Sequence, residues 1–220
     1  MKSALYLITI TLFLFSCKKE KLDIQEGGSS VQFNSPTTPG SYWIYQHYKI
    51  DTNGVETQVQ QIDSLIVLGD TLIDNLTYTV YENFRIVNNN LNQMASNVSF
   101  SRDSSGYRVD RNCEISYSFS NFTDTISKVN VMNLWQSRTK MFKEIQVSVP
   151  AGSFSAIEAR RHYYSLNGGP ANNCGEEYYT LSSWYVDGIG KVKETTGYVT
   201  QLQKCGERID IRLVDYYIAP

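Results

Sequence analysis

The sequence is poor in the residues from which most catalytic and metal sites are built. Only two of its 220 residues are histidines, His47 and His162, so a zinc site with three histidine ligands is excluded. No Gly-x-Ser-x-Gly segment occurs, and that segment is the usual nucleophile turn of serine hydrolases. Cysteine and histidine spacings of the zinc-finger type are also absent. We therefore expect no catalytic residues, no metal and no cofactor.

An excess of charge of one sign is lacking too. The chain has 20 Lys and Arg against 22 Asp and Glu, a net charge of −2. A nucleic-acid partner requires a basic stripe, and the densest basic group after the N-terminal region is Arg160-Arg161-His162. We interpret this group as a solvated strand face and expect no nucleic acid among the partners.

Proline is scarce, with five residues, and no long stretch has apolar residues at helical spacing. The 16 tyrosines and a period-two alternation from Tyr42 onward are instead typical of half-buried strands. Turns are expected at residues 51–54, 150–152 and 187–190, which contain glycine. The sequence predicts an all-β fold, an open or closed antiparallel barrel of roughly ten strands, with a β-sandwich as the alternative. The best helical candidate is residues 127–140.

The longest apolar run stands near the N-terminus. Met1 and Lys2 precede the apolar stretch 4–15, and the small residue Ser16 follows it. This order is typical of a secretory signal peptide, and the stretch is shorter than the roughly 20 residues that span a membrane. Cys17, directly after Ser16, resembles the lipidated cysteine of the bacterial lipoprotein lipobox. The resemblance implies cleavage before Cys17 and lipid attachment to it. The alternative is an ordinary secreted protein with an incidental cysteine.

The chain divides into three predicted parts. Residues 1–16 are the lipoprotein signal peptide, residues 17–39 a lipidated flexible tether, and residues 40–220 a single antiparallel β domain. The tether assignment depends on a composition rich in glycine, serine and proline that shows no apolar period.

Three cysteines remain after Cys17. An exported chain enters an oxidising compartment, where a disulfide is allowed. In a hairpin centred on residues 187–190, Cys174 and Cys205 lie at the open end, so we predict that they pair. Cys113 alternates with apolar neighbours and is predicted to be a buried, inert thiol.

The clearest candidate for acid–base chemistry is a pair of carboxylates. In a hairpin that turns at residues 150–152, Glu144 would face Glu158, and facing carboxylates can act as acid and base. Like charges are also tolerated on wet strand surfaces beside an arginine, and we favour that interpretation. His47 alternates out of phase with Tyr42, so we expect it to point to solvent.

Aromatic residues lie on both faces of two predicted strands. Tyr42 and Trp43 begin the first strand, and Trp184 and Tyr185 precede the turn at 187–190. Exposed rings can stack on sugars or line an apolar cavity, so these four residues are the candidate ligand face. Packing between strands is the simpler explanation of the same pattern.

Three longer motifs carry a resemblance: 40–45 (Gly-Ser-Tyr-Trp-Ile-Tyr), 149–154 (Val-Pro-Ala-Gly-Ser-Phe) and 184–193 (Trp-Tyr-Val-Asp-Gly-Ile-Gly-Lys-Val-Lys). With the Ser-Cys-Lys-Lys start, they resemble uncharacterised lipoproteins of Bacteroidota-type bacteria. Some of these look similar to half-barrels of the lipoprotein-carrier type, which implies an apolar concavity that holds lipid tails. Lipocalins begin with Gly-x-Trp. Here two residues instead of one separate Gly40 from Trp43, so the resemblance to lipocalins fails by one position.

These features predict a membrane-anchored extracytoplasmic lipoprotein at the outer membrane, with a binding or envelope-assembly accessory domain that is not an enzyme. Its expected partners are the membrane, through the N-terminal lipid, and an apolar small molecule, a glycan or an envelope protein. The alternatives are a ligand-free structural module and, ranked third, a hydrolase built on the carboxylate pair. An interior void lined by aromatic and aliphatic residues would favour ligand binding.

Overall fold

The computed structural model describes residues 35–87, 90–168, 178–197 and 207–220, which contain strands and turns but no helix. The strands are β1 (Tyr42–Ile50), β2 (Glu56–Ile73), β3 (Leu76–Val87), β4 (Asn90–Ser104), β5 (Tyr107–Asp110), β6 (Ile115–Ser118), β7 (Thr125–Val131), β8 (Trp135–Val149), β9 (Gly152–Ser165), β10 (Tyr178–Val186), β11 (Gly190–Thr196) and β12 (Arg208–Tyr217). The predicted all-β class is confirmed, with twelve strands in place of about ten. Within the described residues, no helix is long and apolar enough to cross a membrane.

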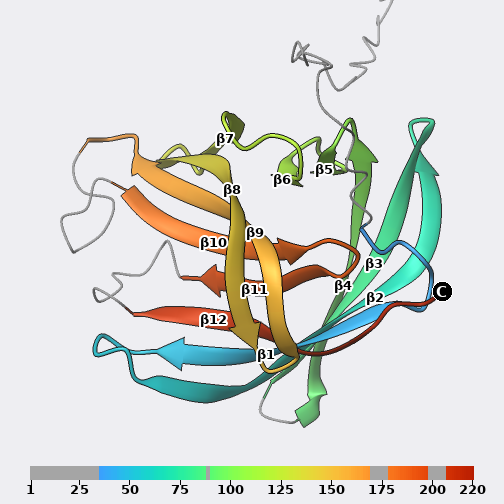
Figure 1. Cartoon of the computed structure of the whole chain (residues 1–220), viewed down its shortest axis with the longest axis horizontal. Coiled ribbons are helices and arrows are strands. Elements are labelled where there is room, and N and C mark those ends of the chain that lie inside the picture. The colour runs from blue at the N-terminus through green and yellow to red at the C-terminus, as the bar shows by residue number, and fades with distance from the viewer. Residues whose placement is uncertain (1–34, 88–89, 169–177, 198–206) are drawn as a thin grey trace, which may run out of the picture.

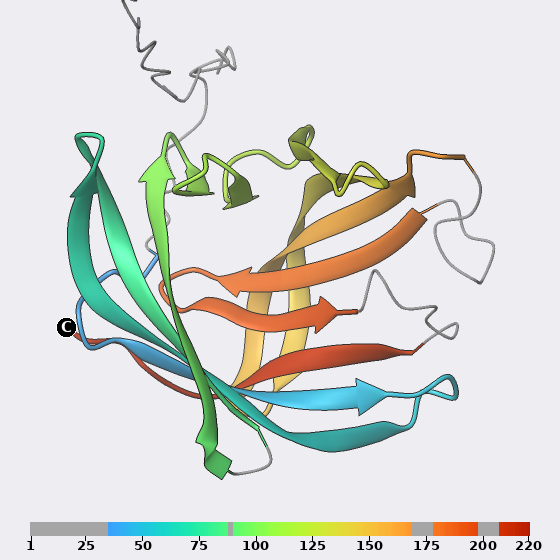
Figure 2. The same ribbon diagram turned by 180° about the vertical axis from the view of Figure 1, so that it is seen from behind.

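All the strands belong to one sheet with the order β6-β5-β4-β3-β2-β1-β12-β11-β10-β9-β8-β7. The first and last strands therefore pair, from Tyr42 opposite Tyr217 to Ile50 opposite Arg208. The two sheet edges, β6 and β7, follow each other along the chain and lie close together at the top of Figure 1. Figure 2 shows from behind how strongly the sheet curls. The result is an antiparallel, nearly closed barrel.

The turn between β1 and β2 lies where the sequence predicts it, and its geometry can be specified. Gly54 has a φ of +80°, which glycine adopts without the steric cost that a Cβ imposes. The Gly54 amide donates to the Asp51 carbonyl at 3.0 Å. Asp51 Oδ1 accepts from the amides of Asn53 and Val55, both at 2.8 Å. The connection is thus a short turn that ends in one left-handed glycine, because Asn53 does not take a positive φ.

Residues 127–140, the helical candidate, form a β-hairpin instead of a helix. They contribute to β7 and β8, which pair from Thr125 opposite Lys140 to Val131 opposite Trp135. Met132 and Asn133 in the turn have φ values of 53° and 54°, the pair of positive angles that matches the twist of a tight hairpin. The helical prediction is therefore wrong, and the sheet context outweighs the local preference of these residues.

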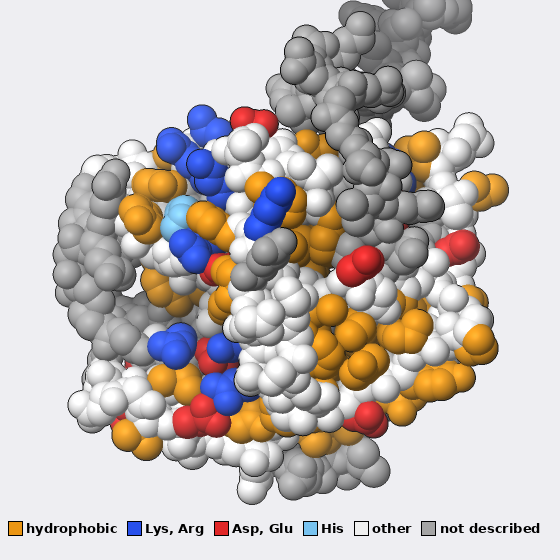
Figure 3. Space-filling model, viewed as in Figure 1, with side chains coloured by type: hydrophobic (Ala, Val, Ile, Leu, Met, Phe, Trp, Pro, Cys, Tyr) orange, Lys and Arg blue, Asp and Glu red, His pale blue; other side chains and the backbone are white. Residues whose placement is uncertain are grey.

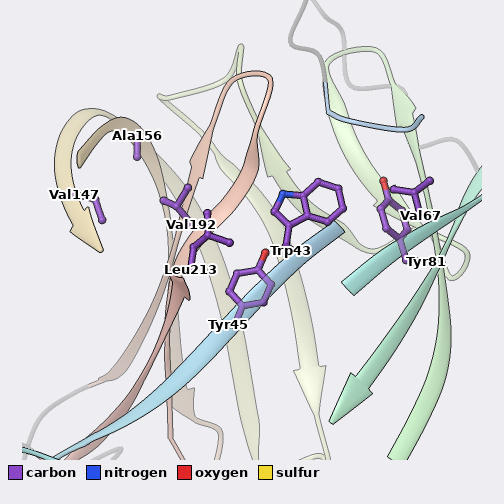
Figure 4. Close-up of a cluster of buried hydrophobic side chains, with 8 residues drawn as sticks. All are labelled: Trp43, Tyr45, Val67, Tyr81, Val147, Ala156, Val192 and Leu213. Carbon is purple, nitrogen blue, oxygen red and sulfur yellow. The ribbon is translucent and has the colours of Figure 1, made fainter. Parts of the chain in front are cut away.

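Buried apolar side chains form two clusters inside the barrel. The first joins β5 and β6 to β7, β8 and β9 and so closes the gap between the sheet edges; its members are Tyr107, Val109, Tyr117, Ile126, Met141 and Ala159. The second, drawn in Figure 4, contains Trp43, Tyr45, Val67, Tyr81, Val147, Ala156, Val192 and Leu213. The interior is therefore built from both ends of the sheet as well as its centre.

The β8–β9 hairpin crosses over β10, β11 and β12 (Figure 1). A bulge between Phe142 and Ile145 interrupts its pairing, and bulges of this kind bend a strand and increase its twist. At the tip, the Ala151 amide donates to the Leu213 carbonyl at 3.1 Å. The bend thus brings Val147 and Ala156 into the cluster of Figure 4.

Candidate functional site

A cavity of about 270 Å³ lies inside the curled sheet, between the β1–β6 wall and the β10–β11 turn. Its aromatic lining consists of Trp43, Tyr45, Tyr81, Phe100, Tyr117 and Tyr185. Trp43 and Tyr45 project from one side of β1, and Tyr81 faces the same interior from β3 (Figure 4). Rings of this kind offer a large apolar contact area at low entropy cost.

Trp43 and the β10–β11 turn fix the position of this wall. The Trp43 indole nitrogen donates to the Ile189 carbonyl at 2.6 Å. Gly190 has a φ of +97°, and a Cβ at this position would lie 3.8 Å from the indole nitrogen. A Cβ would fit at this distance, so the left-handed φ, and not a lack of space, favours glycine in this turn.

Arg108 of β5 is a buried cation on the cavity wall, with its side chain 5% exposed. Its Nη1 group lies 3.2 Å from Asp103 Oδ1, and its Nη2 group donates to the Tyr81 hydroxyl. The guanidinium also lies 5.6 Å from the centre of the Tyr81 ring. Because Asp103 is exposed whereas Arg108 lines the cavity, the pair presents its positive side to the interior.

Lys191 supplies a second cation from the β11 end. Burial by itself would lower the pKa of Lys191, but the Glu194 carboxylate together with Tyr45 and Tyr185 outweighs that effect and raises it. Lys191 Nζ lies 2.5 Å from Glu194 Oε2, and the Lys191 carbonyl accepts from the Tyr45 hydroxyl at 2.9 Å. Lys191 is therefore charged at neutral pH and held beside Tyr45.

Tyrosine hydroxyls add to the polar part of the lining, which also contains Asn83, several serines and one carboxylate residue, Asp110. Burial raises the pKa of Tyr45, Tyr117 and Tyr185, because a phenolate would be poorly solvated there. These hydroxyls are thus protonated at neutral pH and able to donate hydrogen bonds. The Tyr117 hydroxyl shares a 2.7 Å hydrogen bond with Ser35 Oγ, and its ring centre lies 4.0 Å from that of Tyr185.

The predicted ligand face consists of two pairs of sequence neighbours, Tyr42 with Trp43 and Trp184 with Tyr185. Trp43 and Tyr185 line the cavity, whereas Tyr42 and Trp184 do not. The ring of Tyr42 lies 6.0 Å from that of Tyr217, and Lys193 Nζ lies 4.9 Å from the Trp184 ring. Neighbouring residues on a strand point to opposite faces, so one member of each pair enters the cavity and the other packs elsewhere.

Sequence reasoning missed Tyr81, Arg108, Tyr117 and Lys191. Arg108 lies in the four-residue strand β5, where three successive residues are buried, so no alternation marks an inward face. Lys191 stands beside a bulge in the β10–β11 pairing, where Tyr185 faces Lys191 and Trp184 faces Lys193, and an extra residue of this kind interrupts the alternation of faces along the strand. Tyr81 lies on the same strand face as Thr77 and Thr79, so its polar neighbours gave no sign of an inward position.

His47 is 4% exposed, so the prediction that it points to solvent is wrong. Its Nε2 lies 2.9 Å from Asp63 Oδ2. The prediction took Tyr42 as the inward phase of the strand, but Trp43 and Tyr45 hold the inward positions. A bulge between Gln46 and Tyr48 changes the register next to His47.

The predicted pairing of Glu144 with Glu158 is wrong. Glu158 lies opposite Phe142, because the β8 bulge takes Glu144 out of the regular register. Glu158 is 4% exposed and forms an ion pair with Arg160 at 2.7 Å. The favoured interpretation of Glu158 as a solvated surface residue beside an arginine is also wrong, because Glu158 is buried, although the neighbouring arginine is present.

Cys113 differs from its prediction as an inert thiol, because it takes part in a disulfide. It lies in the turn between β5 and β6 with a φ of 64°, and its amide donates to the Asp110 carbonyl at 3.1 Å. Cys17, Cys174 and Cys205 lie outside the described residues, so lipid attachment and the Cys174–Cys205 pair stay predictions. Because the chain has four cysteines and Cys113 is in a disulfide, these two predictions exclude each other within one chain. In the described part of the chain, no group of three or more His, Cys, Asp or Glu residues could hold a metal ion.

Comparison with solved structures finds the same architecture in two bacterial proteins. A candidate exported protein with a YmcC-like fold from Bacteroides fragilis matches with a TM-score of 0.54 and 13% identity, over 84% of this chain and 99% of that one. A candidate lipoprotein from Parabacteroides distasonis matches with a TM-score of 0.51 and 12% identity, over 84% and 98%. The chain shares this fold. The resemblance to Bacteroidota-type lipoproteins is thereby confirmed at the level of architecture.

Other comparisons add less to the YmcC-like fold assignment. A LolA superfamily protein from Nitrosomonas europaea covers 86% of this chain and 89% of its own, but with 7% identity and a TM-score of 0.23. No protein-family model and no curated protein matches the sequence. At these identities the matched structures show the architecture alone, and the chemistry of the cavity depends on its own residues.

Proposed function

We propose that this protein is a non-enzymatic extracytoplasmic lipoprotein that binds a small amphiphilic molecule in its interior cavity. The observation that carries the proposal is the aromatic cavity with a buried arginine and a lysine in its walls. A ligand-free structural module needs no such void, because protein interiors are normally packed to the density of organic crystals.

The lining defines the chemistry of the ligand. Trp43, Leu65 and Phe100 offer apolar contacts, and Arg108 and Lys191 offer positive charge. The volume of about 270 Å³ lies just below the roughly 300–1,000 Å³ of common ligand sites. The ligand that fits best is therefore a small molecule with an apolar body and one anionic or strongly accepting end.

The envelope location follows from the N-terminal sequence. A signal peptide ending at Ser16 and a lipid on Cys17 would hold the domain at the outer membrane, since acylation at two sites is sufficient for stable anchoring. The matched structures, a candidate lipoprotein and a candidate exported protein, support an envelope location. Binding at the membrane surface suits an amphiphilic ligand.

Two fluorescent probes test the cavity. The sulfonate probe 8-anilino-1-naphthalenesulfonate has an apolar ring system and an anionic end, and N-phenyl-1-naphthylamine has the same rings without the charge. We expect both to fluoresce more strongly on binding, and the sulfonate probe to bind about tenfold more tightly because of Arg108 and Lys191.

A cavity-filling variant supplies the control. Ser116 lines the cavity, so Ser116→Phe should weaken binding of both probes at least about tenfold. Ser96 on β4 is exposed and is not part of the lining, so Ser96→Phe should leave binding unchanged. Equal binding by the wild type and Ser116→Phe would disprove the proposal.

A further inference from the structure

The outer face of β7, β8 and β9 brings five basic side chains together. Lys128 pairs with Arg138, Arg138 pairs with His162, and Lys140 pairs with Arg160. Facing residues on neighbouring strands lie on one side of the sheet, as do residues two apart along one strand. These five side chains are therefore neighbours on one surface, which we call the basic face.

The basic face carries an excess of positive charge in a chain whose net charge is −2. Lys128, Arg138 and Lys140 are exposed, and Arg160 is half-buried. Strands β7–β10 contain one carboxylate whose side chain the structure describes. It is Glu158, which lies buried next to Arg160. Figure 3 shows Lys and Arg side chains gathered at the upper left, over the region of β7 to β9 in Figure 1.

Buried neighbours fix the orientation of Arg160. Its Nε and Nη2 donate to the two Glu158 oxygens at 3.0 and 2.7 Å. The Ser182 hydroxyl donates to the same carboxylate at 2.6 Å, and the guanidinium lies 4.1 Å from the centre of the Phe142 ring. A guanidinium held in this way loses little conformational freedom when it binds a partner.

Aromatic rings continue the basic face toward β10. The ring centre of Tyr178 lies 4.4 Å from that of His162 and 5.4 Å from that of Tyr164. The Arg138 guanidinium lies 4.6 Å from the centre of the Tyr164 ring. Tyr178 is 40% exposed, so cations and an accessible ring meet on one surface.

We propose that the basic face binds an acidic polysaccharide. Carboxylate or sulfate groups pair well with guanidinium and ammonium groups, and the exposed ring offers a flat apolar surface to a sugar. An open strand face suits an extended polymer, whose repeated weak contacts reinforce one another. A membrane surface fits less well, because the exposed Tyr178 ring packs against His162 and Tyr164 and is not free to insert among lipids.

The test uses the full chain with Cys17→Ala, so that no acyl group contributes to binding. Immobilised alginate, a polymer of uronic acids, is the probe, and uncharged dextran is the reference polymer. We expect binding to alginate that weakens with added NaCl, because salt screens exposed charges. Arg138→Gln with Lys140→Gln should weaken it about tenfold, the effect of losing two charge-assisted contacts.

Two matched controls separate the basic face from charge and aromatic content in general. Lys49 and Arg111 are exposed cations elsewhere, so Lys49→Gln with Arg111→Gln should change alginate binding less than about twofold. Tyr178→Ala should weaken binding about threefold, whereas Tyr217→Ala, at another exposed tyrosine, should not.

The proposal is refuted if the protein does not bind alginate at low ionic strength. It is also refuted if the double variant at Arg138 and Lys140 and the double variant at Lys49 and Arg111 lose alginate affinity equally. Vesicles of phosphatidylglycerol form the last arm. If they bind more tightly than alginate, with the same dependence on Arg138 and Lys140, the face is a membrane contact. Lys128→Gln, at the exposed end of the face, repeats the charge test independently.

Discussion

Asp63 on β2 is held between two nitrogen-bearing side chains. Arg85 donates to it twice, to Oδ1 and Oδ2, at 2.8 Å each, and His47 Nε2 lies 2.9 Å from Oδ2. Burial alone would raise the pKa of Asp63, but the hydrogen bonds from Arg85 and His47 outweigh burial and lower it. The folded state therefore favours the ionised carboxylate.

This pKa shift predicts a loss of stability in acid. A carboxyl group with a lowered folded pKa stabilises the fold above its unfolded pKa, about 3.9, and loses that contribution as the pH falls toward the folded value. Asp63→Asn should lower the free energy of unfolding by about 1–3 kcal/mol at pH 7. The difference from the wild type should shrink below about pH 4.

Urea unfolding monitored by circular dichroism between pH 7 and pH 2 measures this difference. Asp70→Asn, at an exposed carboxylate, serves as the comparison and should follow the wild-type curve. A difference between Asp63→Asn and the wild type that stays constant across this range would contradict the assignment.

Residue-scale prediction from sequence succeeded in part. Two of the four aromatic candidates, Trp43 and Tyr185, line the cavity, and Tyr42 and Trp184 do not; their role as a ligand face stays a prediction. The inward phase of β1 was not predictable, because both faces carry aromatic residues. An error of one position moves every side chain to the other face, and His47 was misplaced for that reason.

At the scale of elements, the turns decide where the strands end. Met132 and Asn133 both have positive φ in the β7–β8 turn, and Met132 is 72% exposed. A left-handed conformation costs a residue with a side chain roughly 1 kcal/mol. The exposed Met132 side chain contributes little packing that could offset this cost.

Met132→Gly should therefore stabilise the protein. We expect the free energy of unfolding to rise by about 0.5–1 kcal/mol, because glycine adopts this φ without a Cβ clash. Leu134→Gly in the same turn, where φ is not positive, should destabilise it by a similar amount. Chemical unfolding of both variants measures the effect, and destabilisation by Met132→Gly would show that its side chain contributes packing.

The hairpins illustrate which elements a sequence can specify. Glycine turns at 51–54, 150–152 and 187–190 mark three strand pairs correctly, because turn residues have local conformational requirements. The β7–β8 turn contains no glycine, so the same reasoning missed it. The β8 bulge also left no local signal, and it overturned the Glu144–Glu158 register.

At the scale of the whole molecule, the central expectation is attachment to a membrane through Cys17. Cys17→Ala should abolish fatty-acid labelling and release the protein from the membrane fraction, since the acyl chains provide the anchoring. Metabolic labelling with radioactive palmitate and membrane fractionation measure the two effects. Retained label in Cys17→Ala would remove the lipoprotein assignment, and an unlabelled but released wild type would indicate simple secretion.

The sequence by itself determined the strand-rich class and three of the turns, and its signal peptide and lipidated Cys17 stay predictions. Each of these depends on local composition or on the conformational needs of a few adjacent residues. Only the tertiary structure decided which side chains lie inside, because bulges shift strand phase and the curling of the sheet joins distant strands. The cavity cation Arg108 comes from β5, next to one edge of that sheet, and Lys191 comes from β11 near its middle, so no local pattern connects them.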